Sequence, residues 1–447
     1  MRPELLRRYA APVPRYTSYP TAPHFSSAVD QSRYGSWLDT LEDGTPLSLY
    51  VHIPFCNELC WYCGCSTKIT RKKSPITRYL KALSREIDTV AGRIKTRHRV
   101  LHIHWGGGSP SILAPDEIRA LAGQLKERFE FAEGAEFAVE IDPRGLDEAR
   151  IAAFADAGVN RVSIGVQDFD MAVQEAINRM QSVEQTAWVV DTFRAHGIRA
   201  INVDLVYGLP FQTLETLETT VDHVLSMRPD RIALFGYAHL PQRIKHQRLI
   251  ADNSLPDTAA RLALATRAAE RLTQGGFVTV GLDHYALPQD PLASGSVRRN
   301  FQGYTTDTAA ALIGLGASSI GRLPQGYAQN TSAIGDYERR VLDGGLATVR
   351  GHEMSAEDAA RGLVIERLMC DFTFPAEELR ARFGEIADPI IAEADALCDA
   401  EADEMIASRG SGAGFQITDK GRIFVRSICA TFDTYLGKGL AQHSAGV

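Results

Sequence analysis

The sequence predicts an α/β protein in which a partial TIM-like (β/α)6 barrel (residues 48–330) follows an N-terminal arm (1–47) and precedes a mainly helical C-terminal domain (331–447). Two observations predict this fold class. From Leu47 onward, short apolar runs alternate with amphipathic stretches, which is typical of parallel strands joined by helical crossovers. Polar residues recur where these apolar runs end, and the carboxyl ends of barrel strands form the edge at which active sites lie.

The arm is rich in proline, tyrosine and arginine. Its residues 12–25, PVPRYTSYPTAPHF, are predicted to be extended, because a proline disfavours helix at the residue before it. The aromatic side chains of Tyr16, Tyr19 and Phe25 indicate that the arm packs on the rest of the chain.

The barrel is predicted from seven apolar runs and the helical stretches between them. We expect strands at 47–55, 99–108, 136–143, 161–169, 200–210, 231–240 and 277–287. We expect helices at 74–94, 115–129, 146–158, 171–196, 214–227 and 258–274. The polar residues at the strand ends are Cys56 onwards, Gly106 to Ser109, Glu140, Asp142, Gln167, Asp204 and Tyr237 to His239.

The pattern changes near Arg298. The segment RRNFQGYTTDTAAALIGLGASSIG is predicted to be loop and short elements that close over the barrel. From Ser355 on the chain is predicted to be mainly helical, with late strands at GFQIT and GRIFVRS, which raises a winged-helix-like domain and DNA binding as an alternative. Acidic residues outnumber basic ones in this segment, the wrong sign for a surface that binds phosphates, so we expect no nucleic-acid partner.

The composition is that of a globular protein of 447 residues with a formal net charge of −7. No apolar run approaches the roughly 20 residues of a membrane helix, so we expect no membrane span. The N-terminus lacks the apolar core of a signal peptide, and we therefore expect a reducing cytoplasm in which thiols are available as ligands.

Four of the seven cysteines lie between Tyr50 and Cys65. Cys56, Cys60 and Cys63 have the spacing C-x3-C-x2-C, and Cys65 follows after one glycine. Such thiolates can hold zinc or an iron–sulfur cluster. Structural zinc usually draws on two ligand pairs separated by a longer loop. The four cysteines here lie in one loop, which favours an iron–sulfur cluster. Three thiolate ligands would leave one iron of a four-iron cluster open.

This spacing, with Tyr62 before the third cysteine, resembles the signature of radical S-adenosylmethionine (SAM) enzymes. The resemblance implies a [4Fe-4S] cluster whose open iron binds the amino and carboxylate groups of SAM. Residues 106–110, GGGSP, resemble the glycine motif that supports the methionine part of SAM.

Over nearly the whole chain, the sequence further resembles the oxygen-independent coproporphyrinogen III oxidases. The motifs that carry this resemblance are PVPRYTSYPTAPHF, YVHIPFCNELCWYCGC, HWGGGSPS, EIDPRG, SIGVQDF, NVDLVYGLP, FGYAHLP, RRNFQGYTT and ICATFDTYL. The segment QDPLASGSV is shorter than in some relatives, and Arg298 stands where histidine is often expected. These departures concern the residues that would contact the substrate and not the SAM chemistry. Haem-binding chaperones of the same superfamily are the first alternative, although they generally lack both the arm and Cys65; a zinc-stabilised barrel with unrelated chemistry is the second.

The resemblance implies roles for individual residues. Cys56, Cys60 and Cys63 would bind the cluster, and Cys65 would lie nearby without being a ligand. Tyr50 and Cys65 are the candidate catalytic residues. Two SAM molecules are implied, the first held by Tyr50, Gly107 and Glu140. The second would be held by Gly108, Ser109, Gln167, Arg179, Asp204, Ala238 and Ile320. His52 is open to two interpretations, a proton donor or a packed strand residue.

The implied reaction converts coproporphyrinogen III to protoporphyrinogen IX in porphyrin (haem) biosynthesis. The reduced cluster would cleave SAM to methionine and a 5′-deoxyadenosyl radical, which would abstract hydrogen from the β-carbon of a propionate. Loss of carbon dioxide and of one further electron would then leave a vinyl group. Two such rounds would convert two propionates. The electron donor and electron acceptor are unidentified, and the oligomeric state is open, with a monomer as one alternative. Because the substrate carries four carboxylates, we expect a basic patch, with Arg7, Arg8, Arg15, Arg298 and Arg299 as candidates.

Overall fold

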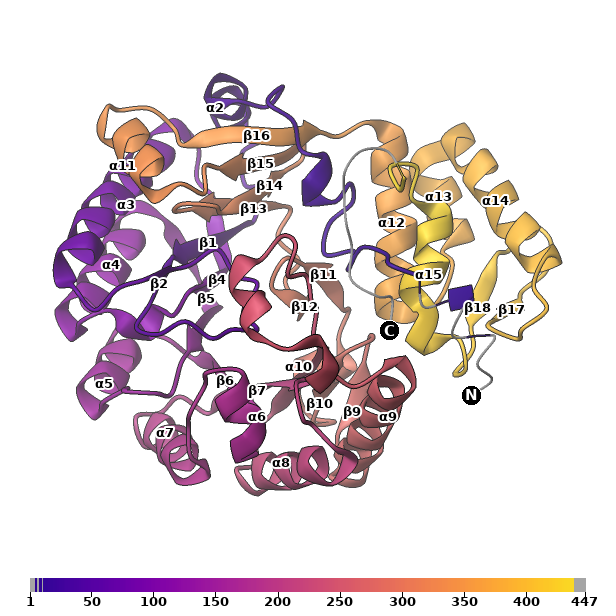
Figure 1. The fold of residues 1–447 in the computed structure, drawn as a ribbon. Coiled ribbons are helices and arrows are strands. Elements are labelled where there is room, and N and C mark those ends of the chain that lie inside the picture. The colour runs from indigo at the N-terminus through magenta and orange to yellow at the C-terminus, as the bar shows by residue number, and fades with distance from the viewer. Residues whose placement is uncertain (1–4, 6–7, 10, 438–447) are drawn as a thin grey trace.

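The computed structural model describes residues 5, 8–9 and 11–437. Within this part of the chain the main feature is a twelve-stranded sheet whose six central strands run parallel (Figure 1). In spatial order its strands are β16 (Thr348–Glu353), β15 (Gly326–Asn330), β14 (Ile320–Leu323), β13 (Ala311–Leu315), β1 (Leu47–Ile53), β4 (Arg99–Gly107), β5 (Glu130–Ile141), β6 (Arg161–Gln167), β7 (Ala200–Tyr207), β8 (Arg231–Gly236), β10 (His284–Ala286) and β9 (Val278–Val280). The first and last strands do not pair with each other, so the barrel is open.

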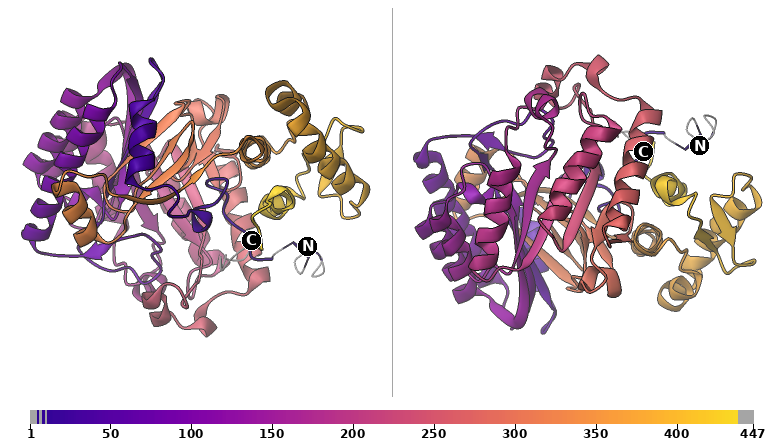
Figure 2. Two further views of the ribbon diagram at one scale, coloured as in Figure 1. Left: turned by 90° about the horizontal axis from the view of Figure 1, so that it is seen from above. Right: turned by 90° about the horizontal axis from the view of Figure 1, so that it is seen from below.

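Helices cover the outer face of the parallel strands (Figures 1 and 2). They are α3 (Lys73–Arg93), α4 (Pro115–Arg128), α5 (Glu148–Asp156), α6 (Met171–Ala176), α7 (Val183–Ala195), α8 (Leu214–Ser226) and α9 (Thr258–Gln274). In α3 the buried side chains follow helical spacing, at Ile76, Tyr79, Leu83, Ile87 and Val90, and this apolar stripe packs on the sheet. The alternation of strands and helices confirms the predicted (β/α)6 fold class.

Polar side chains start several of these helices. The N-cap residues of α5, α7, α8 and α9 each accept a hydrogen bond from a backbone N–H of the first turn; they are Asp147, Ser182, Thr213 and Asp257. Such a cap satisfies one of the backbone donors that the first turn leaves unpaired, which fixes where each helix begins after its strand.

The sheet extends beyond the barrel units at one edge. Strand β13 pairs with β1 in parallel, and β14, β15 and β16 follow in antiparallel order. The short elements predicted for residues 298–321 are present as short strands, but β13 and β14 belong to the main sheet instead of closing over the barrel. Glycine allows the close pairing: a Cβ on Gly314 would lie 2.8 Å from the backbone carbon of Ile320. Further short elements are α2 (Gln31–Asp39), α11 (Ile334–Leu342), β11 (Arg298–Asn300), β12 (Gly303–Thr305) and α10 (Pro291–Ser294), the last of which lies against β9 and β10 at the opposite edge.

The C-terminal helices lie beside the barrel in both views of Figure 2. They are α12 (Ala356–Asp371), α13 (Ala376–Phe383), α14 (Ala387–Asp399) and α15 (Val425–Cys429), with a hairpin of β17 (Ile406–Ser408) and β18 (Phe415–Ile417). Strand β18 confirms the late strand at GFQIT. The predicted strand at GRIFVRS is wrong, because Val425, Ile428 and Cys429 recur at helical spacing and are buried on one face of α15.

The arm packs on these C-terminal helices. Tyr16 and Tyr19 belong to the same apolar cluster as Leu368, Phe374 and Phe424. Tyr16 Oη also donates a hydrogen bond to Asp433 Oδ2 over 3.1 Å. The prediction that the aromatic residues of the arm pack on the chain is therefore confirmed, whereas the division into three units at residues 47 and 330 stays a prediction.

None of the helices in the described residues has the length and apolar character needed to cross a membrane. Short 3-10 helices complete the fold; they are η1 (Ala22–His24), η2 (Pro110–Ile112), η3 (Lys245–Leu249), η4 (Asp252–Ser254), η5 (Gly384–Ile386), η6 (Arg422–Phe424) and η7 (Ala430–Phe432).

Candidate active site

The cysteine-bearing loop is closed at its base by a short parallel pair of strands. Strands β2 (Phe55–Cys56) and β3 (Lys68–Ile69) pair directly, so residues 57–67 form a loop between them. Two neighbouring segments hold this loop. Ile177 O accepts a hydrogen bond from Trp61 N over 2.9 Å, and Gln247 Nε2 donates to Tyr62 O over 2.9 Å. The loop is therefore fixed by contacts with the rest of the barrel.

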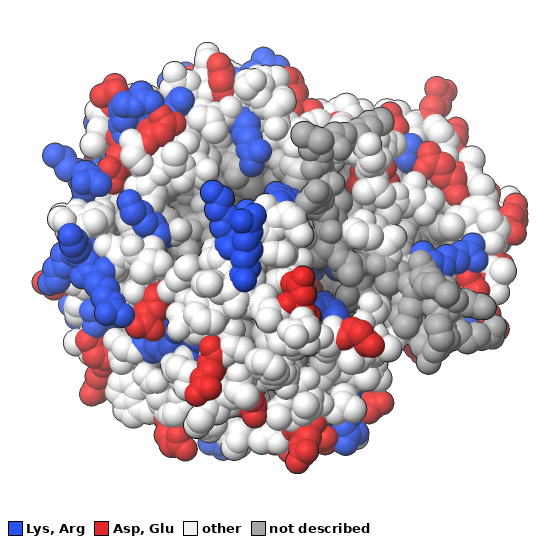
Figure 3. All heavy atoms as spheres, viewed as in Figure 1, with Lys and Arg blue, Asp and Glu red and all other residues white. Residues whose placement is uncertain are grey.

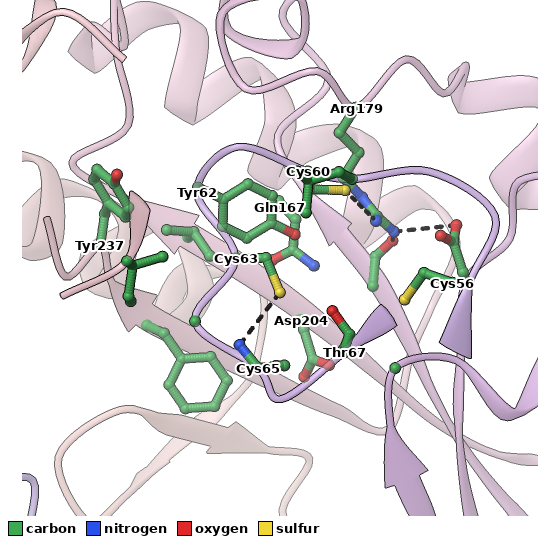
Figure 4. Close-up of a pocket in the computed structure, with 18 of the residues that line it drawn as sticks. Cys56, Cys60, Tyr62, Cys63, Cys65, Thr67, Gln167, Arg179, Asp204 and Tyr237 are labelled. Carbon is green, nitrogen blue, oxygen red and sulfur yellow. Dashed lines mark hydrogen bonds and ion pairs between the residues drawn. The ribbon is translucent and has the colours of Figure 1, made fainter. Parts of the chain in front are cut away.

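The loop covers a cavity of about 720 Å³ at the carboxyl ends of the parallel strands. All four loop cysteines line it (Figure 4). The other predicted site residues that line it are Gly107, Gly108, Glu140, Gln167, Arg179, Asp204 and Ala238. The sequence therefore predicts a set of residues that the fold brings together from the cysteine loop, the ends of β4 to β8 and the segment between α6 and α7.

Two arginines lie beside the buried Cys60 sulfur. Arg144 Nη2 donates to Cys60 Sγ over 3.3 Å, and Arg179 Nη1 lies 3.6 Å from the same sulfur. Asp142 pairs with both guanidinium groups, at 2.7 Å from Arg144 Nη2 and 3.4 Å from Arg179 Nη2. Both guanidinium groups therefore direct cationic donors at this sulfur, and such donors stabilise negative charge on a sulfur ligand.

The other thiols differ in their surroundings. Hydrogen bonds from the side chain and backbone N–H of Cys65 lower the pKa of Cys63 to about 6, although burial opposes the shift. Burial, together with the neighbouring Cys63, raises the pKa of Cys56 to about 12. Cys65 is exposed to the cavity, and its N–H donates to Cys63 Sγ over 3.4 Å (Figure 4).

The donor set fits an iron–sulfur cluster. The three cysteines with the C-x3-C-x2-C spacing lie in one loop and all line the cavity, and thiolates are the usual ligands of such clusters. Among the described residues, no group of three or more His, Cys, Asp or Glu side chains surrounds a point as ligands of a single metal ion would. A cluster does not need that arrangement, because each thiolate binds a separate iron.

The glycine segment at the end of β4 is required by close packing. A Cβ on Gly107, whose φ is 111°, would lie 2.5 Å from the His52 ring, and one on Gly108 would lie 2.4 Å from Phe55 O. Both glycines therefore let β4 approach the base of the cysteine loop. The same absence of side chains leaves backbone facing the cavity, as a ligand's close approach also requires.

A chain of polar side chains leads from β1 to the cavity wall. Tyr50 Oη lies 2.9 Å from His52 Nδ1, and the Tyr50 ring stacks on His104 with 5.9 Å between centroids. His104 Nε2 lies 3.1 Å from Glu140 Oε1, and Gly107 N donates to Glu140 Oε2 over 3.1 Å. Burial opposes ionisation of Glu140, but these hydrogen bonds lower its pKa, so the carboxylate is held ionised.

Asp204 is a second carboxylate in the cavity. Ser163 Oγ and Asn202 Nδ2 donate to it, each over 2.8 Å. Burial raises the pKa of Asp204 to about 6, and the negative charge of Glu140 adds to the rise. Gln167 lies beside it with a φ of 70°, an uncommon backbone conformation for a non-glycine residue.

With this geometry established, comparison with known proteins decides the family. Residues 50–224 match the family model of the radical SAM superfamily. The chain is 45% identical over 455 residues to the oxygen-independent coproporphyrinogen III oxidase of Paracoccus denitrificans, covering 99% of this chain and 98% of that relative. This chain belongs to the oxygen-independent coproporphyrinogen III oxidases.

Two further relatives agree. The oxygen-independent coproporphyrinogen III oxidase of Bradyrhizobium diazoefficiens is 45% identical over the full length of both chains. The solved structure of coproporphyrinogen III oxidase from Escherichia coli, a radical SAM enzyme, superposes with a TM-score of 0.89 at 37% identity, covering 94% of this chain and 98% of that chain. The predicted family, its radical SAM fold and its oxidoreductase class are confirmed.

Three residues predicted from the resemblance to the oxygen-independent coproporphyrinogen III oxidases lie outside the cavity lining. Tyr50 is behind Glu140 in the polar chain. Ser109 is buried, and its Oγ accepts from Asp142 N over 3.1 Å. Ile320 begins β14, where it pairs with Gln329. Their contact with SAM stays a prediction.

Sequence reasoning missed several residues of this oxidase's site. Arg144 contacts Cys60, and Gln247 binds both Tyr62 O and Ala238 O, the latter over 3.1 Å. Arg144 could have been found from the motif EIDPRG, since it follows a polar strand end. Gln247 lies in η3, whose sequence has no periodic pattern, and only the fold brings it to the loop.

Proposed function

We propose that this chain converts coproporphyrinogen III to protoporphyrinogen IX without oxygen, by oxidative decarboxylation of two propionates to vinyl groups in haem biosynthesis. The observation that carries the proposal is family membership over the full chain, joined to a cavity in which three spaced cysteines face the strand ends. A cytoplasmic location, an unidentified electron donor and electron acceptor, and a monomeric state belong to the same proposal.

The proposed cofactors are a [4Fe-4S] cluster held by Cys56, Cys60 and Cys63, and two SAM molecules. When bound, they would supply the one-electron chemistry that removes a hydrogen atom from each reacting propionate. The protein's contribution is to bind and orient these groups and to exclude water from the cavity.

The residues of the chain suit these tasks. Arg144 and Arg179 donate to Cys60 Sγ and stabilise its negative charge. Glu140 and Asp204 offer carboxylate oxygens that can accept hydrogen bonds from ribose hydroxyls or an amino group. Tyr50 and Cys65 are the proposed catalytic residues; Cys65 faces the cavity directly, whereas Tyr50 acts on it through His104 and Glu140.

Anaerobic turnover of coproporphyrinogen III with SAM and a reductant tests this function. The proposal predicts carbon dioxide, protoporphyrinogen IX and 5′-deoxyadenosine as products. Haem retained by the purified protein without vinyl formation would instead identify a haem-binding relative, and zinc without iron would contradict the proposed cluster.

A further inference from the structure

A second cavity, of about 810 Å³, adjoins the first. It lies between the end of β8, helix α9 and the C-terminal helix α15. Four residues line both cavities: Arg15 of the arm and Phe235, Gly236 and Tyr237 at the end of β8. The two cavities are therefore neighbours that share one wall.

Four arginines from separate segments line the second cavity, and they are Arg15, Arg261, Arg299 and Arg426. The acidic residues that line it are Asp283, Glu270 and Asp419. Glu270 and Asp419 lie at the mouth, with side chains 55% and 93% exposed, and each pairs with an arginine outside the cavity. Asp283 is the one acidic side chain that the described residues place deep in the cavity, so positive charge dominates its interior.

Arg299 is buried in this cavity, and two of its guanidinium nitrogens lack a hydrogen-bond partner among the described residues. Its side chain is 5% exposed, and its guanidinium lies 4.4 Å from the Tyr304 ring centroid. Nη2 donates to Arg15 O over 3.3 Å, whereas Nε and Nη1 have no hydrogen-bond partner among the described residues. Nη1 is 3.9 Å from Asp283 Oδ1, an ion-pair distance that is too long for a hydrogen bond. Buried donors without acceptors are costly, so this site is suited to an incoming carboxylate.

Arg15 is fixed at the junction of the two cavities. Arg426 donates to the preceding carbonyls, to Val13 O over 2.6 Å and to Pro14 O over 3.1 Å. Arg15 Nη2 donates to Gly236 O over 2.9 Å. Burial and the charge of Arg15 lower the pKa of Arg426 to about 10, in keeping with an excess of positive charge.

The rest of the lining is apolar, with Leu234, Phe235, Leu262, Leu282 and Ile423 among its side chains. An apolar cavity of this size with a few convergent charged groups is typical of a site for a large organic ligand. Lysine and arginine side chains also stand over the middle of the barrel's front face in Figure 3, although the chain is acidic overall.

We propose that the second cavity binds the part of the tetrapyrrole that is not reacting, with Arg299 and Arg15 pairing with its carboxylates while one propionate enters the first cavity. This inference rests on the proposed function. Coproporphyrinogen III carries four propionates and loses two, so the enzyme must hold carboxylates away from the reacting centre. Of the sequence candidates, Arg15 and Arg299 line this cavity; Arg8 pairs with Asp403, Arg298 is not in its lining, and Arg7 lies outside the described residues.

The test compares Arg15→Gln and Arg299→Gln with the control Arg33→Gln. Arg33 is an exposed arginine on α2 that pairs with Glu353, and neither residue lines either cavity. Coproporphyrin III, which keeps the four carboxylates, and its tetramethyl ester are titrated by fluorescence, and KM and kcat are measured for coproporphyrinogen III. We expect each of the two variants to raise the Kd for coproporphyrin III and the KM about tenfold or more. The control should match the wild type, and the ester should bind wild type and variants equally weakly.

Unchanged Kd and KM in Arg15→Gln would overturn the inference, and so would tight binding of the ester. Iron content and thermal denaturation report whether Arg299→Gln folds. If it does not fold, the result for Arg15→Gln alone tests the inference, because Arg15 is exposed. A wild type that binds coproporphyrin III but makes no vinyl product would contradict the proposed function. The inference about this cavity would then be tested by the Kd values of the wild type and the variants.

Discussion

The Arg144 guanidinium donates a hydrogen bond to the Cys60 sulfur over 3.3 Å, and Asp142 holds that guanidinium in place at 2.7 Å. A cationic donor on a ligating sulfur stabilises the more negative, reduced state of a cluster. Arg144 therefore links the strand end of β5 to the redox properties of the proposed cluster.

Arg144→Met should lower the reduction potential of the cluster without removing it. Loss of one charge-assisted hydrogen bond, about 1.4 kcal/mol, corresponds to about 60 mV for a one-electron couple. A redox titration followed by electron paramagnetic resonance measures the shift. Arg150→Met is the control, because Arg150 pairs with Asp147 and Leu113 O instead of a cysteine. A potential equal to that of the control would show that the contact has no electronic role.

Cys65→Ser should retain the cluster, whereas Cys63→Ser should lose most of its iron. The hydrogen bond that Cys63 Sγ accepts over 3.4 Å comes from the backbone N–H of residue 65, which serine preserves. Iron and sulfide content of the anaerobically purified variants checks this. If Cys65→Ser lost as much iron as Cys63→Ser, Cys65 would have to be counted as a ligand.

Gly108→Ala should destabilise the fold, because its Cβ would lie 2.4 Å from Phe55 O and the backbone cannot yield cheaply. We expect a loss of about 1–3 kcal/mol in the free energy of unfolding. Gly123→Ala in α4 is the matched control: nothing lies within 4 Å of its Cβ, and alanine should stabilise the helix by up to about 1 kcal/mol. Chemical denaturation measures both, and equal stabilities for the two variants would refute the packing argument.

The buried Glu86 makes stability depend on pH. Burial raises the pKa of Glu86 to about 7 from the model-compound value of 4.5, although Tyr337 Oη, Gly316 N and Asn330 Nδ2 donate to its carboxylate. The folded state binds this proton more tightly than the unfolded state, so stability falls as pH rises from about 4.5 to about 7 and then levels off.

Comparison with Glu86→Gln isolates this effect, since glutamine does not titrate. The difference in unfolding free energy, wild type minus variant, should fall by about 3 kcal/mol between pH 4.5 and pH 8. Denaturant unfolding at several pH values measures it. A difference that rises with pH would mean that the hydrogen bonds outweigh burial.

The sequence predicted the core of the fold and site because the relevant signals are local. The spacing of Cys56, Cys60 and Cys63 is contained in one loop, and polar strand ends such as Glu140 and Asp204 reach one edge once the strands are parallel. Other features depend on partners distant in sequence. Strand β13 pairs with β1 more than 250 residues earlier, and no local pattern predicts that pairing.

The same limit applies to the second cavity. Arg426 lies in GRIFVRS, for which the sequence predicts a strand, whereas it belongs to helix α15 and donates to carbonyls of the arm. Arg261 lies on the amphipathic helix α9, where an arginine is usually a solvated residue, and only the packing of α9 beside α15 places it on a cavity.

The central claim is that three cysteines in this cavity support decarboxylation of coproporphyrinogen III. The most direct measurement compares wild type and Cys56→Ser in one anaerobic assay with SAM and a reductant, quantifying carbon dioxide, protoporphyrinogen IX and 5′-deoxyadenosine. The account predicts all three products from the wild type and none from the variant. Product formation by Cys56→Ser at a wild-type rate, or a folded, iron-loaded wild type that yields no vinyl product, would contradict it.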